Sequence, residues 1–257
     1  MNRRLFTALE LVPVSILGAA LFLWPFVAGG APAAAVVLAI TTGMVVVLAA
    51  VEAGTRRLDA RRFALLVTVA AIDAALRLVL VIGVEGFTPF FFLVLVAGYV
   101  YGPSFGFLCG ATSLLASAVA TGGIGPWLPY EAIACGWVGM VAGFAGLPRR
   151  GAAGWGDVAV LAVVGAVTGF AYGALLDVWD WTTFYRGAAG FGFVPGLPPL
   201  DLVRRFADFY AVTSFVYDSF RAAGNAVLIV LLGLPVITAL ARVRDRFTVT
   251  ILPDLAT

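Results

Sequence analysis

Long apolar runs, separated by short polar or Gly/Pro-rich segments, dominate the chain. A run of about 20 apolar residues is long enough to cross the hydrocarbon core of a bilayer as a helix. On this basis the pattern predicts an all-α, polytopic membrane bundle of about eight transmembrane helices. The expected spans are 5–28, 33–53, 63–83, 89–101, 104–120, 127–146, 157–177 and 207–241. The fourth is the shortest, and we expect it to be tilted or partly re-entrant.

Composition agrees with this pattern. Of the 257 residues, 62% are hydrophobic and only 12% are charged, and the mean hydropathy is +1.06. Soluble domains carry about 25% charged residues. The sequence therefore predicts a multi-pass integral membrane protein. No break in composition divides it, so we expect one bundle.

The distribution of arginine predicts the orientation of the bundle. Eleven of the sixteen basic residues fall in segments 1–4, 54–62, 147–156 and 242–257, which all lie on one side of the eight predicted spans. The opposite side holds Arg186, Arg204 and Arg205, and the remaining two lie within spans. Cytoplasmic loops are enriched in Lys and Arg. We therefore expect both termini to be cytoplasmic.

The third span carries two opposite charges, in the stretch VTVAAIDAALRLVL. Asp73 and Arg77 are four residues apart, so they share a helical face and can pair. At about 1.5 Å per residue, Asp73 lies near the middle of the bilayer, counted from Arg62. An isolated charge there costs at least about 2.5–3.5 kcal/mol. The spacing predicts an ion pair that faces the bundle interior. A direct role in binding or coupling is the alternative.

Other polar residues within spans gather at the predicted outer side. Glu131 lies near the start of the sixth span, Asp177 ends the seventh, and Asp218, Arg221 and Asn225 share one face of the eighth. Convergence of polar groups from several helices is typical of a binding pocket, although each could instead meet lipid headgroups. The predicted substrate-binding residues are Arg77, Trp127, Tyr130, Glu131, Trp179, Trp181, Asp218, Arg221 and Asn225.

Aromatic residues crowd the same side and suit a ring-containing ligand, although an interfacial aromatic belt explains many of them. The segment 178–206 is rich in Gly, Pro and aromatic residues. It is too long for a passive connection. We expect it to cap the pocket.

The chain lacks the residues that several kinds of functional site require. The chain has no histidine and no lysine, so it lacks an ordinary zinc site and the phosphate-binding G-x-x-x-x-G-K-[ST] motif. Cys109 and Cys135 lie in apolar, Gly/Ala-rich segments. We expect a binding protein without catalysis, metal or cofactor. A standalone secondary transporter stays open, as does an intramembrane enzyme that uses Asp73, Glu131 or Asp218.

The stretch FFFLVLVAGYVYGPSFGFLCGATSLLASAVATGGIGPWLPYEAIACGWVGMVAGFAG, with the later ALLDVWDW and RAAGNAVLIVLLGLPV, resembles the substrate-binding (S) membrane subunits of energy-coupling factor (ECF) transporters, which belong to the ABC importers. The resemblance covers roughly residues 62–242. It implies a six-helix core that binds a vitamin or related micronutrient at the extracellular side of a bacterial plasma membrane. A transmembrane coupling subunit, driven by two cytoplasmic ATPases, is the implied partner.

In such subunits the first core helix carries small residues that dock on the coupling subunit. Here these would be Ala70, Ala71, Ala74 and Ala75, at a spacing that lets another helix approach closely. The chain departs from the family in two ways. Asp73 interrupts the alanine pattern, and residues 1–61 add two helices and an Arg-rich loop before the core at 62–246 and the tail at 247–257.

Among the family's ligands we favour cobalamin, because the chain resembles the actinobacterial branch. Queuosine precursors, riboflavin and thiamine remain alternatives.

Overall fold

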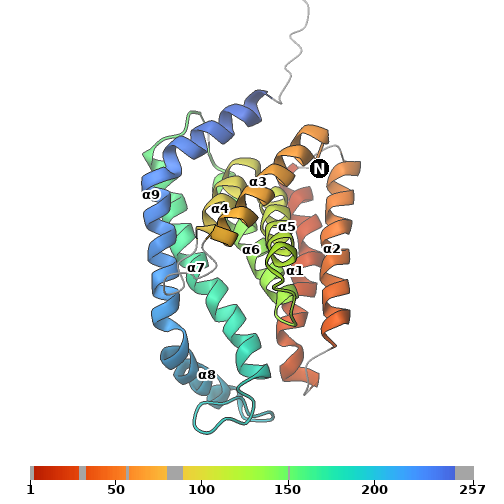
Figure 1. The fold of residues 1–257 in the computed structure, drawn as a ribbon, viewed down its shortest axis with the longest axis vertical. Coiled ribbons are helices and arrows are strands. Elements are labelled where there is room, and N and C mark those ends of the chain that lie inside the picture. The colour runs from red at the N-terminus through yellow and green to blue at the C-terminus, as the bar shows by residue number, and fades with distance from the viewer. Residues whose placement is uncertain (1–2, 29–32, 56–57, 80–88, 150, 247–257) are drawn as a thin grey trace, which may run out of the picture.

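The computed structural model describes residues 3–28, 33–55, 58–79, 89–149 and 151–246. Within these ranges every regular element is an α-helix, and the helices run mostly along one axis (Figure 1). They are α1 (Arg3–Ala28), α2 (Ala34–Gly54), α3 (Ala60–Val79), α4 (Phe90–Tyr101), α5 (Pro103–Thr121), α6 (Leu128–Gly146), α7 (Trp155–Thr183), α8 (Pro199–Thr213) and α9 (Phe215–Arg246).

Six of these helices are long and apolar enough to cross a membrane, which confirms the prediction of a helical membrane protein. They are α1 (within Glu10–Ala28), α2, α5, α6, α7 and α9. The other two predicted spans correspond to α3 and α4. Arg61, Arg62, Asp73 and Arg77 reduce the apolar character of α3, and α4 has only 12 residues. The predicted segment 80–83 lies outside the described residues.

The structure corrects the segment 178–206. Residues up to Thr183 continue α7, and a separate helix, α8, begins at Pro199. The connection is therefore 184–198, about half the predicted length. The predicted eighth span also divides into two helices, because the helix is interrupted at Ser214, between α8 and α9.

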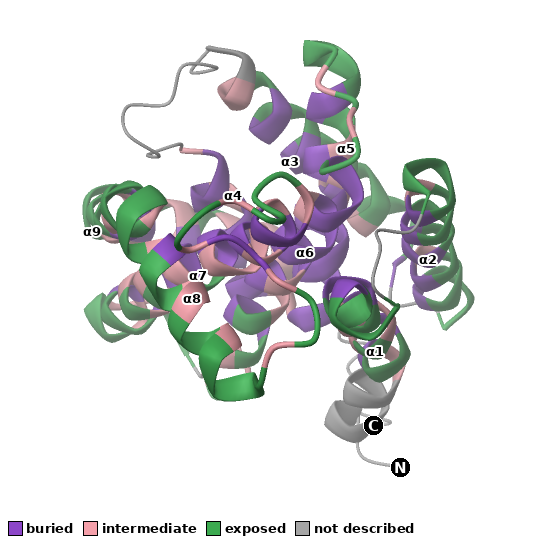
Figure 2. Ribbon diagram, turned by 90° about the horizontal axis from the view of Figure 1, so that it is seen from below, coloured by how far each residue is buried: buried purple, intermediate pink, exposed green. Residues whose placement is uncertain are grey.

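Helices α4, α5 and α6 form the centre of the bundle, where burial is densest (Figure 2). Glycines make this packing possible. A Cβ on Gly98 or Gly106 would collide with the backbone carbonyl of Gly139, and a Cβ on Gly139 would collide with Gly106. Close backbone approach through small residues is the usual basis of helix association in membranes. The junction of these three glycines therefore fixes how α4, α5 and α6 meet.

The two N-terminal helices, α1 and α2, flank the central helices on one side of the bundle. Helix α1 packs against α6, where a Cβ on Gly18 would collide with the rings and methyl groups of Trp137 and Ile133. Phe22 of α1 meets Tyr130 edge-on, with ring centroids 5.2 Å apart. Helix α2 stands further out and exposes much of its surface (Figure 2). Helix α1 is thus an integral part of the bundle.

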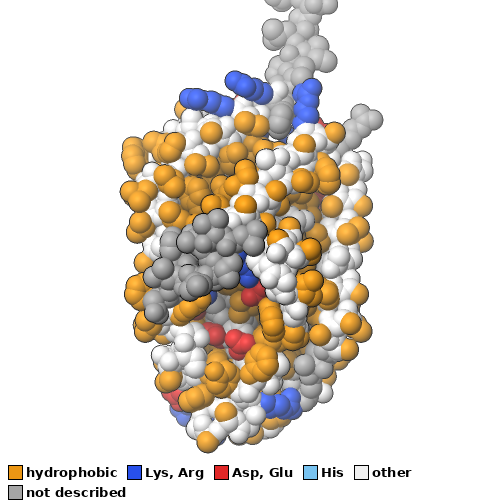
Figure 3. Space-filling model, viewed as in Figure 1, with side chains coloured by type: hydrophobic (Ala, Val, Ile, Leu, Met, Phe, Trp, Pro, Cys, Tyr) orange, Lys and Arg blue, Asp and Glu red, His pale blue; other side chains and the backbone are white. Residues whose placement is uncertain are grey.

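The two ends of the bundle differ in charge. Helix α1 begins and α9 ends at the same end, while α8 lies at the opposite end (Figure 1). Basic side chains gather at the first of these ends (Figure 3). We call the first the basic end and the second the α8 end.

Candidate functional site

The arginine of α3 joins three helices. The Nη1 atom of Arg77 donates a hydrogen bond to the Ser117 hydroxyl of α5 at 2.9 Å. Its Nη2 atom lies 3.7 Å from Oε2 of Glu131, in the first turn of α6. The guanidinium also lies over the ring of Phe90, 5.7 Å from its centroid. Both charged side chains keep some exposure, 31% for Arg77 and 19% for Glu131.

The predicted close ion pair of Asp73 and Arg77 is not found among the described residues, although Arg77 is near enough to attract the Asp73 carboxylate. Asp73 is completely buried, and neither carboxylate oxygen has a hydrogen-bond partner among the described residues. It lies close to Ser113 of α5. Arg77 turns instead toward Glu131. Arg77 lies one helical turn beyond Asp73 on α3, and from there its side chain also reaches the start of α6. Spacing within one helix could not reveal that competing partner.

A second ion pair lies within α9. Arg221 and Asp218 pair at i and i+3, and both residues are buried. The guanidinium of Arg221 lies over two tyrosine rings, with centroids 5.4 Å away for Tyr172 and 5.1 Å away for Tyr217. A cation over an aromatic face gains electrostatic stabilisation from the ring. Arg221 is therefore stabilised by Asp218 and by both tyrosine rings.

Helix α8 is tied to this pair. The Tyr210 hydroxyl donates to Oδ2 of Asp218 at 2.9 Å, and the Ser214 hydroxyl donates to Oδ1 of Asp177 at 2.7 Å. Burial first, and then the bond to Asp218, raise the pKa of Tyr210. The hydroxyl therefore keeps its proton and remains a donor. The Tyr210 bond joins α8 to the first turn of α9, and the Ser214 bond joins the residue that follows α8 to α7.

The groups of α3, α6, α7 and α9 form one electrostatic cluster. Glu131 interacts with Arg77, Asp180 and Arg221, and Asp177 interacts with Asp180, Asp218 and Arg221. Acidic side chains gather beside a basic one on the face drawn in Figure 3. We call Arg77, Glu131, Asp177, Asp180, Asp218 and Arg221 the outer cluster. It lies toward the α8 end.

Asn225 and most of the predicted aromatic residues make contacts that hold helices of the bundle together. Asn225 donates from Nδ2 to the Gly165 carbonyl at 3.1 Å and so joins α9 to α7. Trp179 and Tyr130 are buried against each other, with centroids 5.6 Å apart. The Trp181 indole donates to the Phe191 carbonyl at 2.7 Å.

Trp181 lies in a small aromatic core with Phe193 and Phe209. Trp127 is 38% exposed. Three of the four predicted aromatic residues therefore anchor α1, α6, α7 and the 184–198 connection.

Five polar residues that the structure brings to the site were not among the predicted substrate-binding residues. They are Ser117, Tyr172, Asp180, Tyr210 and Ser214. Asp180 had a visible signal, since it lies three residues after Asp177 and shares its helical face. The others become polar partners only through packing between helices.

The four predicted docking alanines divide between two faces of α3. Ala70 and Ala74 are buried against the bundle. Ala71 and Ala75 are exposed, on a face with Phe63, Val67 and Ile72. Asp73 is buried, so it does not lie on that exposed face.

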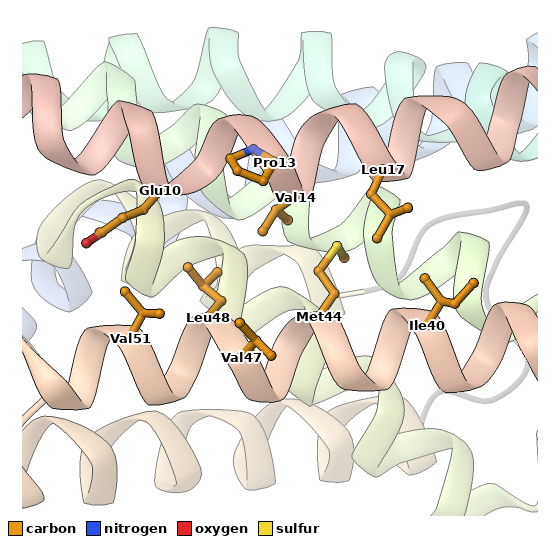
Figure 4. Close-up of a pocket in the computed structure, with 9 residues that line it drawn as sticks. All are labelled: Glu10, Pro13, Val14, Leu17, Ile40, Met44, Val47, Leu48 and Val51. Atoms are coloured by element: carbon orange, nitrogen blue, oxygen red, sulfur yellow. The ribbon is translucent and has the colours of Figure 1, made fainter.

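A separate cavity of about 410 Å³ lies between α1 and α2 (Figure 4). Val14 and Leu17 of α1 face Met44 and Leu48 of α2 across it, and Glu10 is the charged residue in its wall. Its lining is almost entirely apolar. The outer cluster offers far more hydrogen-bonding groups for a polar ligand.

No three metal-binding side chains lie together among the described residues. In comparisons with known proteins, no protein-family model, no curated protein and no solved structure matches the chain.

Proposed function

We propose that the chain is the substrate-specific membrane subunit of an ECF-type ABC importer in a bacterial plasma membrane. It binds a vitamin or related micronutrient, with cobalamin the ligand that the sequence favours. It docks on a transmembrane coupling subunit driven by two ATPases, and catalyses no reaction itself. In this proposal both termini are cytoplasmic, and α3 and α4 complete the membrane-embedded core.

One observation carries the proposal most directly. A cluster of six charged side chains from four helices gathers toward the α8 end, opposite the basic end. Charged residues within membrane-embedded helices are rare and usually mark a substrate path. By the positive-inside rule, the α8 end is extracellular. The cluster is therefore where an importer subunit would receive its ligand.

The exposed face of α3 supports the proposed docking on a coupling subunit. Ala71 and Ala75 present little side chain, so a helix of another protein can approach the backbone closely. Arg77 lies on the same helix and reaches the outer cluster. Helix α3 thus connects the ligand site with the docking face.

Co-purification tests this proposal. The tagged chain is expressed with an ECF coupling subunit and its two ATPases, extracted in detergent, and compared with Ala71→Trp and Ala75→Trp. We expect the wild type to retain all three partners and both variants to lose them, because an indole holds the helices apart.

The matched control is Val163→Trp, at a position of α7 that is 64% exposed. It should retain the complex. A wild-type chain that never binds the coupling subunit would contradict the proposal, as would loss of binding in all three variants.

A further inference from the structure

Helix α8 presents three different stripes of side chains. The first stripe faces the bundle, where Leu202, Phe206 and Phe209 pack in the aromatic core around Trp181 of α7. Their positions, i, i+4 and i+7, are those of one helical face. The second stripe is charged and exposed, and it consists of Asp201, Arg204 and Asp208. Asp201 and Arg204 also pair with each other, at 3.9 Å.

The third stripe of α8 is apolar and exposed. Its members lie at i, i+3, i+7 and i+11, and they are Leu200, Val203, Ala207 and Ala211. Leu200 is 60% exposed and Val203 is 64% exposed. A surface helix in water normally carries polar residues on its open side. An open apolar stripe beside a charged one is instead typical of helices that lie in the surface of a membrane.

This apolar stripe continues onto the membrane-crossing helices. Tyr210 lies on the same edge of α8 as Val203, seven residues away, and its ring is 6.4 Å from that of Phe215 at the start of α9. Phe215 in turn stacks on Phe170 of α7 at 6.2 Å. Val167, three residues before Phe170, is 61% exposed. Because α7 and α9 are both long and apolar enough to cross a membrane, the apolar side of α8 joins a surface that meets lipid.

We infer that α8 lies in the surface layer of the bilayer, with its apolar stripe against lipid chains and its charged stripe in water. The partner of this exposed stripe is membrane lipid, because the stripe joins the lipid-facing surface of α7. The direction of α8 agrees with this placement, since after the interruption at Ser214 the helix does not follow the line of α9 (Figure 1). Helix α8 is not among the six helices that can cross a membrane, so its contact with lipid is of a different kind.

The inference goes beyond the proposed function and does not depend on it. Lipid contact along α8 requires only that α7 and α9 cross the membrane. It has a consequence for the outer cluster, because Tyr210 and Ser214 bond to Asp218 and Asp177. The bilayer surface therefore helps to hold the polar groups that α8 brings to the ends of α7 and α9.

Spin labels on single introduced cysteines test the inference, with the full chain in lipid nanodiscs. One series samples the apolar stripe and the other the charged stripe; they are Leu200→Cys, Val203→Cys and Ala207→Cys, and Asp201→Cys, Arg204→Cys and Asp208→Cys. All six positions are exposed, so the fold should tolerate each change. The native Cys109 and Cys135 are fully buried. The unsubstituted chain should therefore take up no label.

Each label is exposed to oxygen, which concentrates in lipid, and to a water-soluble nickel chelate. Labels on the apolar stripe should collide with oxygen, relative to the chelate, at least about threefold more than labels on the charged stripe. Val163→Cys is the matched control for lipid contact, because Val163 lies within the apolar length of α7 and is 64% exposed. It should favour oxygen at least as strongly as the apolar stripe.

Two results would overturn the inference. If the chelate reaches both stripes equally, the whole open side of α8 lies in water. If neither reagent reaches the apolar stripe, a protein such as a second copy of the chain covers it. Three positions on each stripe keep the comparison decisive if one variant fails to fold.

Discussion

Arg77 of α3 and Glu131 of α6 form an ion pair at 3.7 Å between helices that are far apart in the sequence. The pair joins the helix that carries the exposed alanine face to the helix at the centre of the bundle. It also places one charge of each sign at the edge of the outer cluster. Its contribution to stability can be measured directly.

We expect Arg77→Met and Glu131→Gln each to lower the free energy of unfolding. The loss should be about 1–3 kcal/mol, less than the roughly 3–5 kcal/mol for a fully buried pair, because both side chains keep some exposure. A double-mutant cycle of unfolding in mixed detergent micelles gives the coupling energy, expected at about 0.5–3 kcal/mol. Strictly additive effects would show that the two side chains do not interact.

For Asp73 we expect the opposite effect, a gain in stability when its charge is removed. Its carboxylate is fully buried without a hydrogen-bond partner among the described residues. Asp73→Asn keeps the shape and removes the charge, so we expect the thermal midpoint to rise. Asp59→Asn, near the start of α3, removes an exposed carboxylate that accepts a bond from the Arg62 backbone, and should bring no gain. A clear fall in the midpoint of Asp73→Asn would show that the carboxylate has a stabilising partner.

The glycine junction at the centre gives a sharp contrast between two similar substitutions. Gly139→Ala should prevent folding or strongly destabilise the bundle, because the new Cβ meets the Gly106 carbonyl and neither backbone can move aside easily. Gly43→Ala in α2 meets nothing within 4 Å. It should be neutral or stabilise by about 0.5–1 kcal/mol, the usual gain from alanine inside a helix. Equal yields of folded protein for the two variants would contradict the described packing of α5 on α6.

Tyr210 provides a pH-dependent test. Its hydrogen bond to Asp218 requires the neutral phenol, and burial raises its pKa above the ordinary value of about 10. The stability from this bond is therefore fully present below pH about 10 and is lost as the pH rises through the pKa of the folded protein. We expect Tyr210→Phe to cost about 1.5–3 kcal/mol at neutral pH and less at high pH.

Alkaline titration of tyrosinate absorbance, wild type minus Tyr210→Phe, isolates this one group. The difference should show ionisation later than that of free tyrosine. A difference spectrum that titrates like free tyrosine would contradict the buried bond.

The sequence predicts most helices because hydrophobic length is a local property. The observed α5 and α6 each begin and end within one residue of the predicted spans 104–120 and 127–146. The seventh span was predicted too short, because the residues after 177 were assigned to the segment rich in Gly, Pro and aromatic residues. In the structure α7 continues to Thr183, where the Trp181 ring is buried among aromatic residues.

The gathering of charged residues was predictable in outline, but their pairings were not. A charged residue within an apolar run is visible in the sequence, so Arg77, Glu131, Asp218 and Arg221 could be identified. Which acid Arg77 meets depends on how α3 packs on α5 and α6. For the same reason the sequence could not reveal that Trp179 and Tyr130, predicted to bind a ligand, pack on each other and, through Tyr130, on Phe22 of α1.

Transport in proteoliposomes tests the central claim most directly. The chain is reconstituted with the coupling subunit and the two ATPases, and uptake of the tightest-binding vitamin is followed with and without ATP. We predict uptake that requires ATP, this chain and the coupling subunit together. Ala71→Trp should abolish uptake and leave binding of the vitamin intact. Uptake that continues without the coupling subunit, or an Ala71→Trp variant that transports normally, would contradict the account.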